Sequence, residues 1–268
     1  MTLTAVVASA QEHAVDTLAS GPVKAKIVTN AQMIGVGGTN ILDTYISPEK
    51  YSGTEIRYIS HTVRERPSAG LFSTVLIHQG YLSFSDNRAN EGGAIAGMYC
   101  FSYGKHLGWT LMADRLRLRA GAQIDANVGF LYNTRNGNNP AQARVSLNLS
   151  PSAAAAYRFA AGRQMMTVGY ELSIPVVGVL FSPNYGQSYY EIFNEGNYDH
   201  NIVPVTVGCA PSLRQMLTLD IHLRRASLRI GYYGDIEQYE VNNLKYHNYS
   251  HIFMIGFVKR FEAIRLRP

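Results

Sequence analysis

The sequence contains few charged residues, only two cysteines and no long apolar run. Charged residues make up 16% of its 268 residues, whereas about 25% is typical of soluble domains. A helix that crosses a membrane needs about 18 or more consecutive apolar residues, and the absence of such a run excludes a helical span. A closed β-barrel is the remaining structure that can cross a membrane with every backbone group hydrogen-bonded. The shortage of charge is expected if much of the outer surface faces lipid.

Motifs for several common enzyme classes are also missing. The chain has no G-x-S-x-G, H-E-x-x-H or P-loop pattern, and no spacing of cysteine and histidine indicates zinc. The two cysteines, Cys100 and Cys209, are too few for a disulfide framework. The strand pattern puts Cys100 on an inward face and Cys209 on an outward face, so we expect no bond between them. These absences predict a protein without a metal ion, a cofactor or a disulfide.

The most regular pattern in the chain lies between Asp114 and Tyr132, where apolar and polar residues alternate. Even positions carry aliphatic and aromatic side chains, whereas odd positions carry arginines and small or polar residues. Because successive side chains of a strand point to opposite faces, this segment predicts one long strand with an apolar wall and a charged wall. Such strands are typical of transmembrane β-barrels, in which about 9 to 11 tilted residues cross the lipid.

Alternating segments of this kind recur and predict an all-β fold, a single antiparallel up-and-down transmembrane β-barrel of about ten strands. The predicted strands cover about 23–36, 55–64, 71–85, 93–109, 114–132, 144–159, 166–174, 202–223, 228–237 and 249–261. Pro204 and Pro211 interrupt the eighth strand, so we expect it to form two pieces. The two faces of the second and third strands are poorly separated, and their register stays open.

The predicted connections alternate between long and short. The long ones, rich in turn-forming residues, are 37–54, 86–91, 133–140, 182–201 and 242–248. Bacterial outer-membrane barrels have long extracellular loops and short periplasmic turns, and an even strand count puts both termini in the periplasm. The pattern therefore predicts a protein of the bacterial outer membrane, surrounded by outer-membrane lipid and with other outer-membrane proteins as candidate partners.

The two ends of the chain carry different signals. Residues 1–10, which end in Ala8-Ser9-Ala10, resemble the end of a secretory signal peptide without its positive start; a plain apolar N-terminus is the alternative. We expect the true start of the protein to lie upstream, or the sequence to be truncated. Residues 11–22 are then a periplasmic segment, 23–262 the barrel and 263–268 a short periplasmic tail.

Periodicity alone does not distinguish a lipid-facing apolar wall from the interior of a soluble, lipocalin-like barrel. Two features favour lipid. The polar wall mixes glycines and serines with charges of both signs, as a crowded lumen requires, and aromatic residues gather at strand ends, where an interfacial girdle lies. A ten-strand barrel is only slightly wider than an eight-strand barrel, whose side chains nearly fill it. We therefore predict a lumen plugged by ion pairs.

Charges withdrawn from water need partners, and the polar wall supplies both signs. The residues that we predict to form this lumen charge network are Arg115, Arg117, Arg119, Asp125, Arg144, Arg158, Glu171, Arg214, Asp220, His222, Arg229, Asp235 and Glu237. In an alternative interpretation, the same residues line a narrow, anion-selective channel for small solutes.

One histidine and carboxylate pair has the arrangement of a catalytic dyad. His222 lies two residues after Asp220 on the same strand face, where the carboxylate could orient the imidazole as a base for a nearby serine. A hydrogen bond within the charge network is the simpler interpretation. His247 and His251 lie on or beside a strand and lack the helical spacing of metal ligands. We expect no enzyme, with a lipid-modifying or proteolytic barrel enzyme as an alternative.

Aromatic residues in the predicted loops are the best candidates for contact with partners or glycans. Packing of the loops over the barrel mouth would use the same side chains. These loop aromatics are Tyr45, Tyr51, Tyr185, Tyr189, Tyr190, Phe193 and Tyr198.

The chain carries a net charge of +5, and its sequence pI is near 9.1. Nucleic-acid binding proteins gather such charge in one patch. The basic residues here are scattered along alternating strands, so we predict no nucleic-acid partner.

The segment Thr39–Arg57 is similar to part of a known family. The matching residues are Gly38-Thr39-Asn40, Leu42-Asp43-Thr44-Tyr45, Ser47-Pro48 and Tyr51-Ser52-Gly53. They resemble small Bacteroidota outer-membrane barrel proteins that carry only the label of a domain of unknown function. The resemblance is architectural over about 23–261. It implies location and fold, and no catalytic residues come with it.

Without a recognised active site or an evident pore, we expect a structural or interaction protein. It would be an accessory subunit that binds beside a larger outer-membrane assembly. The narrow channel and the barrel enzyme are the alternative functions.

Overall fold

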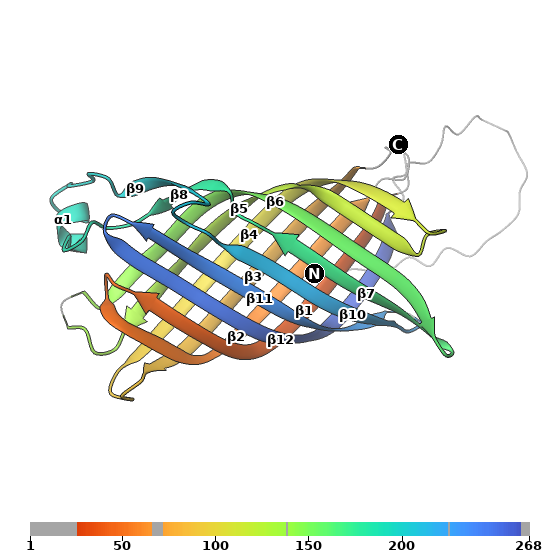
Figure 1. The fold of residues 1–268 in the computed structure, drawn as a ribbon, viewed down its shortest axis with the longest axis horizontal. Helices are drawn as coiled ribbons and strands as arrows, with labels where there is room; N and C mark the ends of the chain where they lie inside the picture. The colour runs from red at the N-terminus through yellow and green to blue at the C-terminus, as the bar shows by residue number, and fades with distance from the viewer. Residues whose placement is uncertain (1–25, 66–71, 138, 225, 264–268) are drawn as a thin grey trace, which may run out of the picture.

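The computed structural model describes residues 26–65, 72–137, 139–224 and 226–263. They form a closed antiparallel β-barrel (Figure 1), whose strand order β5-β4-β3-β2-β1-β12-β11-β10-β7-β6 closes through the β5–β6 pairing. The predicted all-β, ten-strand barrel is confirmed. The expected signal remnant, the periplasmic segment and all but the first residue of the tail lie outside the described residues.

Eight of the ten wall positions are single long strands. Neighbouring strands pair over most of their length, which leaves no exposed sheet edge in the barrel wall. The strands are β1 (Lys26–Asp43), β2 (Ser47–Glu65), β3 (Phe72–Asn87), β4 (Gly93–Leu111), β5 (Leu116–Asn133), β6 (Ala141–Ala161), β11 (Ser227–Val241) and β12 (Leu244–Ala263).

The other two wall positions are each split by a break that contains proline. β7 (Gln164–Ser173) continues as β8 (Val177–Phe181), and the short helix α1 (Tyr189–Phe193) lies in the loop that follows. The chain then returns as β9 (Ile202–Thr206) and β10 (Leu213–His222), so the expected two pieces of the eighth strand are observed. Pro175 and Pro211 lie in the two breaks, where a residue without a backbone N–H does not interrupt the ladder.

The two breaks lie side by side and leave a gap in the wall pairing. β7 pairs with β10 up to Ser173 and Arg214, and pairing resumes between Val177 of β8 and Thr206 of β9. β8 also stays paired with β6 through Val177 and Leu149. The residues between Thr206 and Leu213 therefore bulge away from β8, and Ser212 Oγ accepts a hydrogen bond from the backbone of Gln238 on β11.

Two of the predicted long loops are wrong. The segment 37–54 contains the end of β1, a turn and the start of β2, because its glycines serve strand packing: a Cβ on Gly37 would lie 1.9 Å from the His251 carbonyl oxygen of β12. The segment 242–248 contains only a turn at Asn242 and Asn243, whose φ values are 53° and 60°. Asparagine tolerates this left-handed conformation better than most residues, so β12 begins at Leu244.

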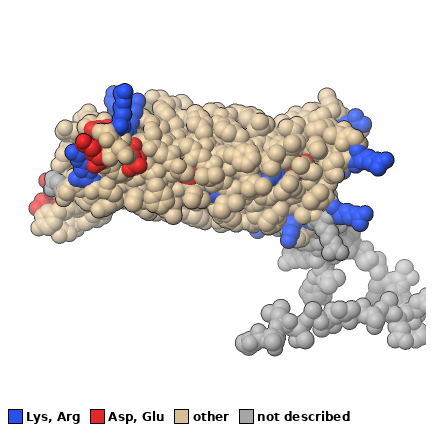
Figure 2. Space-filling view, turned by 90° about the horizontal axis from the view of Figure 1, so that it is seen from below, with Lys and Arg blue, Asp and Glu red and all other residues tan. Residues whose placement is uncertain are grey.

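The walls of β5 and β6 follow the predicted alternation. Ile124 is 52% exposed on the outside, whereas the neighbouring Asp125 is 0% exposed in the lumen. Figure 2 shows the barrel body almost free of charged side chains, with Lys, Arg, Asp and Glu gathered at its two ends. No helix among the described residues is long and apolar enough to cross a membrane.

At the beginning of β1 the apolar side chains face the lumen and the polar side chains face outward, the opposite of the arrangement expected for a wall in lipid. Ala31 and Met33 are each 2% exposed and point into the lumen, whereas Asn30 and Gln32 lie on the outer face with Ser60 of β2. The lumen of this half of the barrel is thus partly apolar, and its outer wall is partly polar.

Candidate functional site in the barrel lumen

Inward side chains fill the lumen in successive levels between two ends. We call the end at which Lys26 pairs with Ala263 the turn end, and the end that carries the loop 182–201 the loop end. Because strands alternate inward and outward residues, each level combines side chains from strands that are far apart in sequence.

The first level, near the turn end, contains two groups of charges. Glu171 of β7 lies 3.7 Å from Arg119 Nη2 and 3.6 Å from His61 Nε2. Arg229 of β11 holds Asp220 of β10 with two hydrogen bonds, of 2.6 and 2.7 Å. Such two-point arginine–carboxylate contacts fix both side chains. This level is therefore braced between the neighbouring strands β10 and β11, and Glu171 of β7 contacts β5 and β2, which are not its neighbours in the wall.

The second level is an apolar layer on one side of the lumen. Met254 and Ile252 of β12 are 0% exposed, and the layer is completed by side chains from β1, β2, β10 and β11. The remaining members are Met33, Ile59, Met216 and Tyr233, with Ile77 of β3 packed against them. The lumen, for which the sequence predicts ion pairs, therefore also contains an apolar part.

The third level contains two arginines, Arg57 and Arg214, that share a carboxylate. Arg57, 1% exposed, donates from Nε to Glu55 Oε1 and from Nη1 to Asp235 Oδ2, each at 2.6 Å. Arg214 lies 3.4 Å from Asp235 Oδ1 and 3.6 Å from Asp125 Oδ2. Asp235 thus joins the two guanidinium groups and links β2, β10 and β11 across the lumen.

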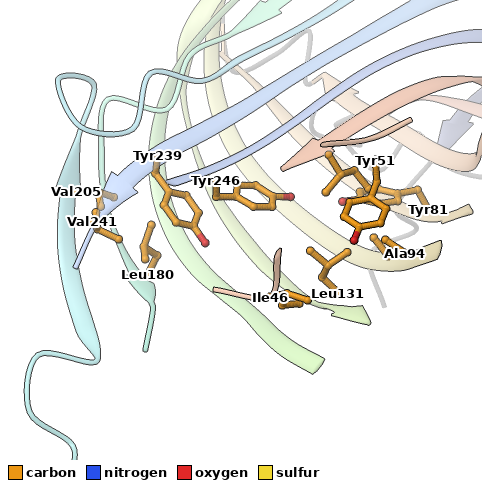
Figure 3. Packing of buried hydrophobic residues seen from close by; sticks show 12 residues of the cluster. Ile46, Tyr51, Tyr81, Ala94, Leu131, Leu180, Val205, Tyr239, Val241 and Tyr246 are labelled. Carbon is orange, nitrogen blue, oxygen red and sulfur yellow. The ribbon is translucent and has the colours of Figure 1, made fainter. Parts of the chain in front are cut away.

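The fourth level, at the loop end, combines aromatic rings with Arg144. The Arg144 guanidinium carbon lies 3.2 Å from the ring centre of Tyr246 and 5.1 Å from that of Tyr239. Its nitrogens lie 3.2 Å from Glu237 and 3.9 Å from Asp43. Figure 3 shows Tyr239, Tyr246 and Tyr51 projecting from the wall into the lumen at the loop end. There Arg144 combines cation–π contacts with ion pairs.

Two cavities among the described residues adjoin these levels. The larger, about 630 Å³ including space open to the outside, adjoins the proline breaks and reaches Arg144 and Glu237. The smaller, about 440 Å³, lies between His61 and Glu171 at one side and Tyr233 at the other. Among the described residues, only Arg214 lines both cavities. Its guanidinium group is paired with Asp125 and Asp235, so two carboxylates hold the side chain that the two cavities share.

The structure brings most of the predicted lumen network together. Its members in ion pairs are Arg119, Asp125, Arg144, Glu171, Arg214, Asp220, Arg229, Asp235 and Glu237. Arg115 differs, because it lies in the turn before β5 and is exposed. Arg117 and Arg158 are exposed near the turn end and form no ion pair with another described residue.

Several central residues were not foreseen in the sequence. Glu55, Arg57 and His61 of β2 share the inward face, but apolar residues on both faces of this strand hid the alternation. Tyr81 of β3 is hidden by the same lack of alternation. Asp43 of β1 lies in the segment 37–54, which the sequence predicts to be a loop. The available signal was the spacing of Glu55 and Arg57, two charges on one face of a strand.

His222 and Asp220, considered above as an alternative catalytic dyad, do not contact each other. Asp220 is held by Arg229, whereas His222 contacts Thr167 Oγ1 at 2.7 Å and Ser227 Oγ at 2.8 Å. A second histidine, His106 of β4, lies 2.5 Å from Ser152 Oγ of β6 through its Nε2. Its other ring nitrogen, Nδ1, has no hydrogen-bond partner among the described residues, so no carboxylate orients the imidazole as in a triad.

The cysteines and histidines do not form a metal centre. Among the described residues, no group of three or more His, Cys, Asp or Glu could hold a metal ion. Cys100 is buried in the lumen. Cys209 lies in the segment before β10 and packs against the cluster of buried residues at the loop end that includes Leu180, Val205 and Val241, instead of facing outward. Both cysteines are free.

The predicted loop aromatics divide into two groups. Tyr51 belongs to β2 and is 5% exposed in the lumen, so its assignment to a loop is wrong. Tyr45 packs edge-on against Tyr189 and donates to the Gln187 carbonyl oxygen at 2.9 Å. The rings that are more than half exposed are Tyr185, Tyr190, Phe193 and Tyr198. Only this second group offers surface to a partner.

Burial affects the titration of the packed loop tyrosines. It raises the pKa of Tyr189 to about 12 and also raises the pKa of Tyr45. Glu191, in the first turn of α1, has a lowered pKa because its carboxylate accepts a hydrogen bond from the Ser188 backbone N–H. The loop over the barrel mouth is therefore held by neutral tyrosines and an ionised helix cap.

A closed antiparallel barrel with an apolar outer wall and a filled, charged lumen is the architecture of outer-membrane β-barrel proteins. The chain belongs to the family described as "Protein of unknown function (DUF3316)", which matches residues 1–268. This confirms the expected unknown-function family, and the expected Bacteroidota source stays a prediction. No curated protein matches the chain.

Solved structures with a similar architecture come from Gram-negative outer membranes. The transport unit of the autotransporter AIDA-I from Escherichia coli has 6% identity and a TM-score of 0.46, over 94% of this chain and 93% of that chain. The outer membrane protease OmpT from Escherichia coli has 8% identity and a TM-score of 0.43, over 92% and 99%. The translocator domain of the autotransporter NalP from Neisseria meningitidis has 12% identity and a TM-score of 0.40, over 90% of each chain. The likeness is one of barrel architecture.

Proposed function

We propose that this protein is a closed barrel of the bacterial outer membrane that works as a structural and interaction protein, an accessory subunit beside a larger outer-membrane assembly. We place the loop end outside the cell and the turn end in the periplasm, because outer-membrane barrels have long extracellular loops and short periplasmic turns. The observation that carries the proposal is Arg214, which lines both cavities and is paired with Asp125 and Asp235.

The other levels support the same function. Met254 and its neighbours form an apolar layer in the lumen, and Tyr239 and Tyr246 pack against Arg144 at the loop end. The charged side chains of the lumen pair with one another, which favours a lumen that serves as a structural core. What the barrel offers to other molecules is then its outer wall and its exposed loop aromatics.

Planar-bilayer recordings test whether the lumen is closed. We expect no conductance steps from the purified wild-type barrel. Arg214→Ala should connect the two cavities and produce small steps, whereas Arg117→Ala, at the exposed turn end, should stay silent. Steady conductance of the wild type would contradict the closed lumen and support the narrow channel.

Co-purification tests the interaction function. The tagged barrel, extracted from native membranes in a mild detergent, should carry a partner in fixed proportion. A variant of the exposed aromatics, Tyr190→Ala with Phe193→Ala, tests whether the partner binds at the loop end; Tyr185→Ala is the single-site comparison. Recovery of the barrel without any partner, in repeated preparations, counts against the accessory-subunit function.

A barrel enzyme is the second candidate, favoured by one observation. Ser152 and His106 form a short contact of 2.5 Å inside the lumen, and a hydrogen bond between a serine and an imidazole is one element of a nucleophile–base pair. Protease and lipase assays on the purified barrel decide it. Activity that Ser152→Ala abolishes and Ser146→Ala leaves intact would support an enzyme; equal results for the two variants would exclude this pair.

A further inference from the structure

The smaller cavity lies where the charged first level of the lumen meets the apolar second level. Its volume is about 440 Å³, including space open to the outside, and pockets that bind small molecules span about 300–1,000 Å³. The cavity is therefore of the size that takes one small organic molecule. Its apolar lining consists of members of the second level, Ile59, Ile77, Met216 and Tyr233.

Three polar side chains that line this cavity each keep an unused hydrogen-bonding atom. These atoms are His61 Nε2, Gln123 Oε1 and Ser173 Oγ, and none has a hydrogen-bond partner among the described residues. The three residues are buried, with exposed fractions of 5%, 3% and 7%. His61 Nε2 lies 3.6 Å from Glu171, which is beyond the usual hydrogen-bond distance. Buried polar atoms without a partner cost free energy, so three on one cavity indicate a site for a molecule that bonds to them.

The unused atoms define the hydrogen-bonding groups of that molecule. Gln123 Nε2 donates to Asp125 Oδ1 at 2.8 Å, which leaves Gln123 Oε1 as an acceptor that needs a donor. The Ser173 hydroxyl can donate and accept, and the His61 nitrogen does one or the other according to its tautomer. Hydroxyl groups on a ligand also donate and accept, so they match all three atoms.

The charged groups that line the cavity already have partners of opposite sign. Glu171 lies 3.7 Å from Arg119, and Arg214 pairs with Asp125 and Asp235. A charged ligand would compete with one of these pairs and would lose its own hydration on entry. The cavity therefore favours an uncharged ligand.

The apolar lining adds a second requirement. Tyr233 donates its hydroxyl to Gln79 Oε1 at 2.9 Å, so it supplies the cavity with a ring and not with an unused donor. Met216 and Ile77 extend this apolar surface. A ligand that fits needs C–H groups for this side and hydroxyl groups for the side of Gln123 and Ser173.

We propose that this cavity binds an uncharged, compact molecule with several hydroxyl groups, of the size of a single sugar ring. The hydroxyl groups bond to His61, Gln123 and Ser173, and the C–H groups pack against the apolar lining. The molecule enters from the turn end past Arg119 and Glu171, whose side chains are 21% and 19% exposed. The inference goes beyond the proposed function and does not depend on it, because a site that is entered from one end needs no continuous pore.

Saturation-transfer NMR on the purified full-length barrel tests the site, in a detergent without a sugar head group. The probes are glucose and glucuronate, which has a similar ring with a carboxylate. We expect saturation transfer to glucose and weaker or no transfer to glucuronate. Titration should show that Ser173→Ala binds glucose about three- to tenfold more weakly, as expected for one lost hydrogen bond.

Matched variants separate the site from a general effect on the barrel. Gln123→Met removes the second unused atom and should weaken glucose binding as Ser173→Ala does. Ser85→Ala is the control, because Ser85 is buried in the lumen and lines neither of the two cavities; it should bind glucose like the wild type. Heat-modifiable mobility on gels confirms that each variant is folded, and if Ser173→Ala does not fold, Gln123→Met carries the comparison.

Three outcomes overturn the proposal. Absence of transfer to glucose in the wild type would mean that the cavity holds only water. Tighter binding of glucuronate than of glucose would mean an anion site. Equal glucose affinities of Ser173→Ala, Gln123→Met and Ser85→Ala would place any binding elsewhere on the barrel. None of these results bears on the accessory-subunit function, which co-purification tests separately.

Discussion

Arg57 of β2 donates from Nη1 to Oδ2 of Asp235 on β11, over 2.6 Å and across 178 residues of sequence. The two strands are not neighbours in the wall, because β1 and β12 lie between them. The pair is therefore a contact through the lumen. Asp235 also forms an ion pair with Arg214, so one carboxylate contacts two guanidinium groups inside the barrel.

Removing one partner of this buried pair should destabilise the barrel strongly. Asp235→Asn removes the charged group that Arg57 and Arg214 share. We therefore expect the free energy of unfolding to fall by about 3–5 kcal/mol. Urea unfolding in detergent micelles, followed by the fluorescence of the single tryptophan, Trp109, measures it. Arg135→Ala, in an exposed pair with Glu91, should cost less than about 1 kcal/mol. Similar losses for the two variants would refute the buried bridge.

Two adjacent glycines should respond very differently to alanine. A Cβ on Gly37 would lie 1.9 Å from a backbone oxygen of β12, whereas a Cβ on Gly38 meets nothing within 4 Å. Gly37→Ala should therefore separate β1 from β12 and reduce the yield of folded barrel, measured by gel mobility without heating. Gly38→Ala should fold like the wild type. If both variants fold equally well, the close approach of β1 and β12 is wrong.

The apolar layer should behave as a packed core. Met254 is 0% exposed, and Met254→Ala should cost about 2–5 kcal/mol by loss of buried area and the cavity left behind. Met112, 66% exposed in a turn, provides the matched control, and Met112→Ala should be close to neutral. The urea midpoints of the two variants make the comparison. An unchanged midpoint for Met254→Ala would show that the layer is not packed.

The loop over the barrel mouth should loosen in acid. The pKa of Glu191 is lowered by the Ser188 backbone N–H, so its capping contribution is complete above the ordinary value of 4.5 and is lost as pH falls through the lowered pKa. Hydrogen exchange of α1 should therefore accelerate at low pH. Glu191→Gln should exchange with little dependence on pH over this range. Equal pH dependence in both proteins would exclude the carboxylate as the cause.

Much of the fold is present in short stretches of the sequence. In β5 the alternation of Ile124, Asp125 and Ala126 indicates a strand and its two faces, because side chains of a strand alternate with a period of two. The proline breaks around Pro211 can be recognised in the same way. These features depend on neighbouring residues alone, so local sequence is enough to predict them.

The sequence by itself determined the barrel class, the strands with clear alternation and the residues that line the lumen along β5, β6, β10 and β11. Only the tertiary structure decided which charges meet, as Arg57 and Asp235 do, that Met33 points inward while Asn30 faces outward, and that Gly37 lies within a strand. The physical reason is that a contact across the lumen depends on the register of every strand between the partners. That register is a property of the closed barrel, and no single stretch of sequence contains it.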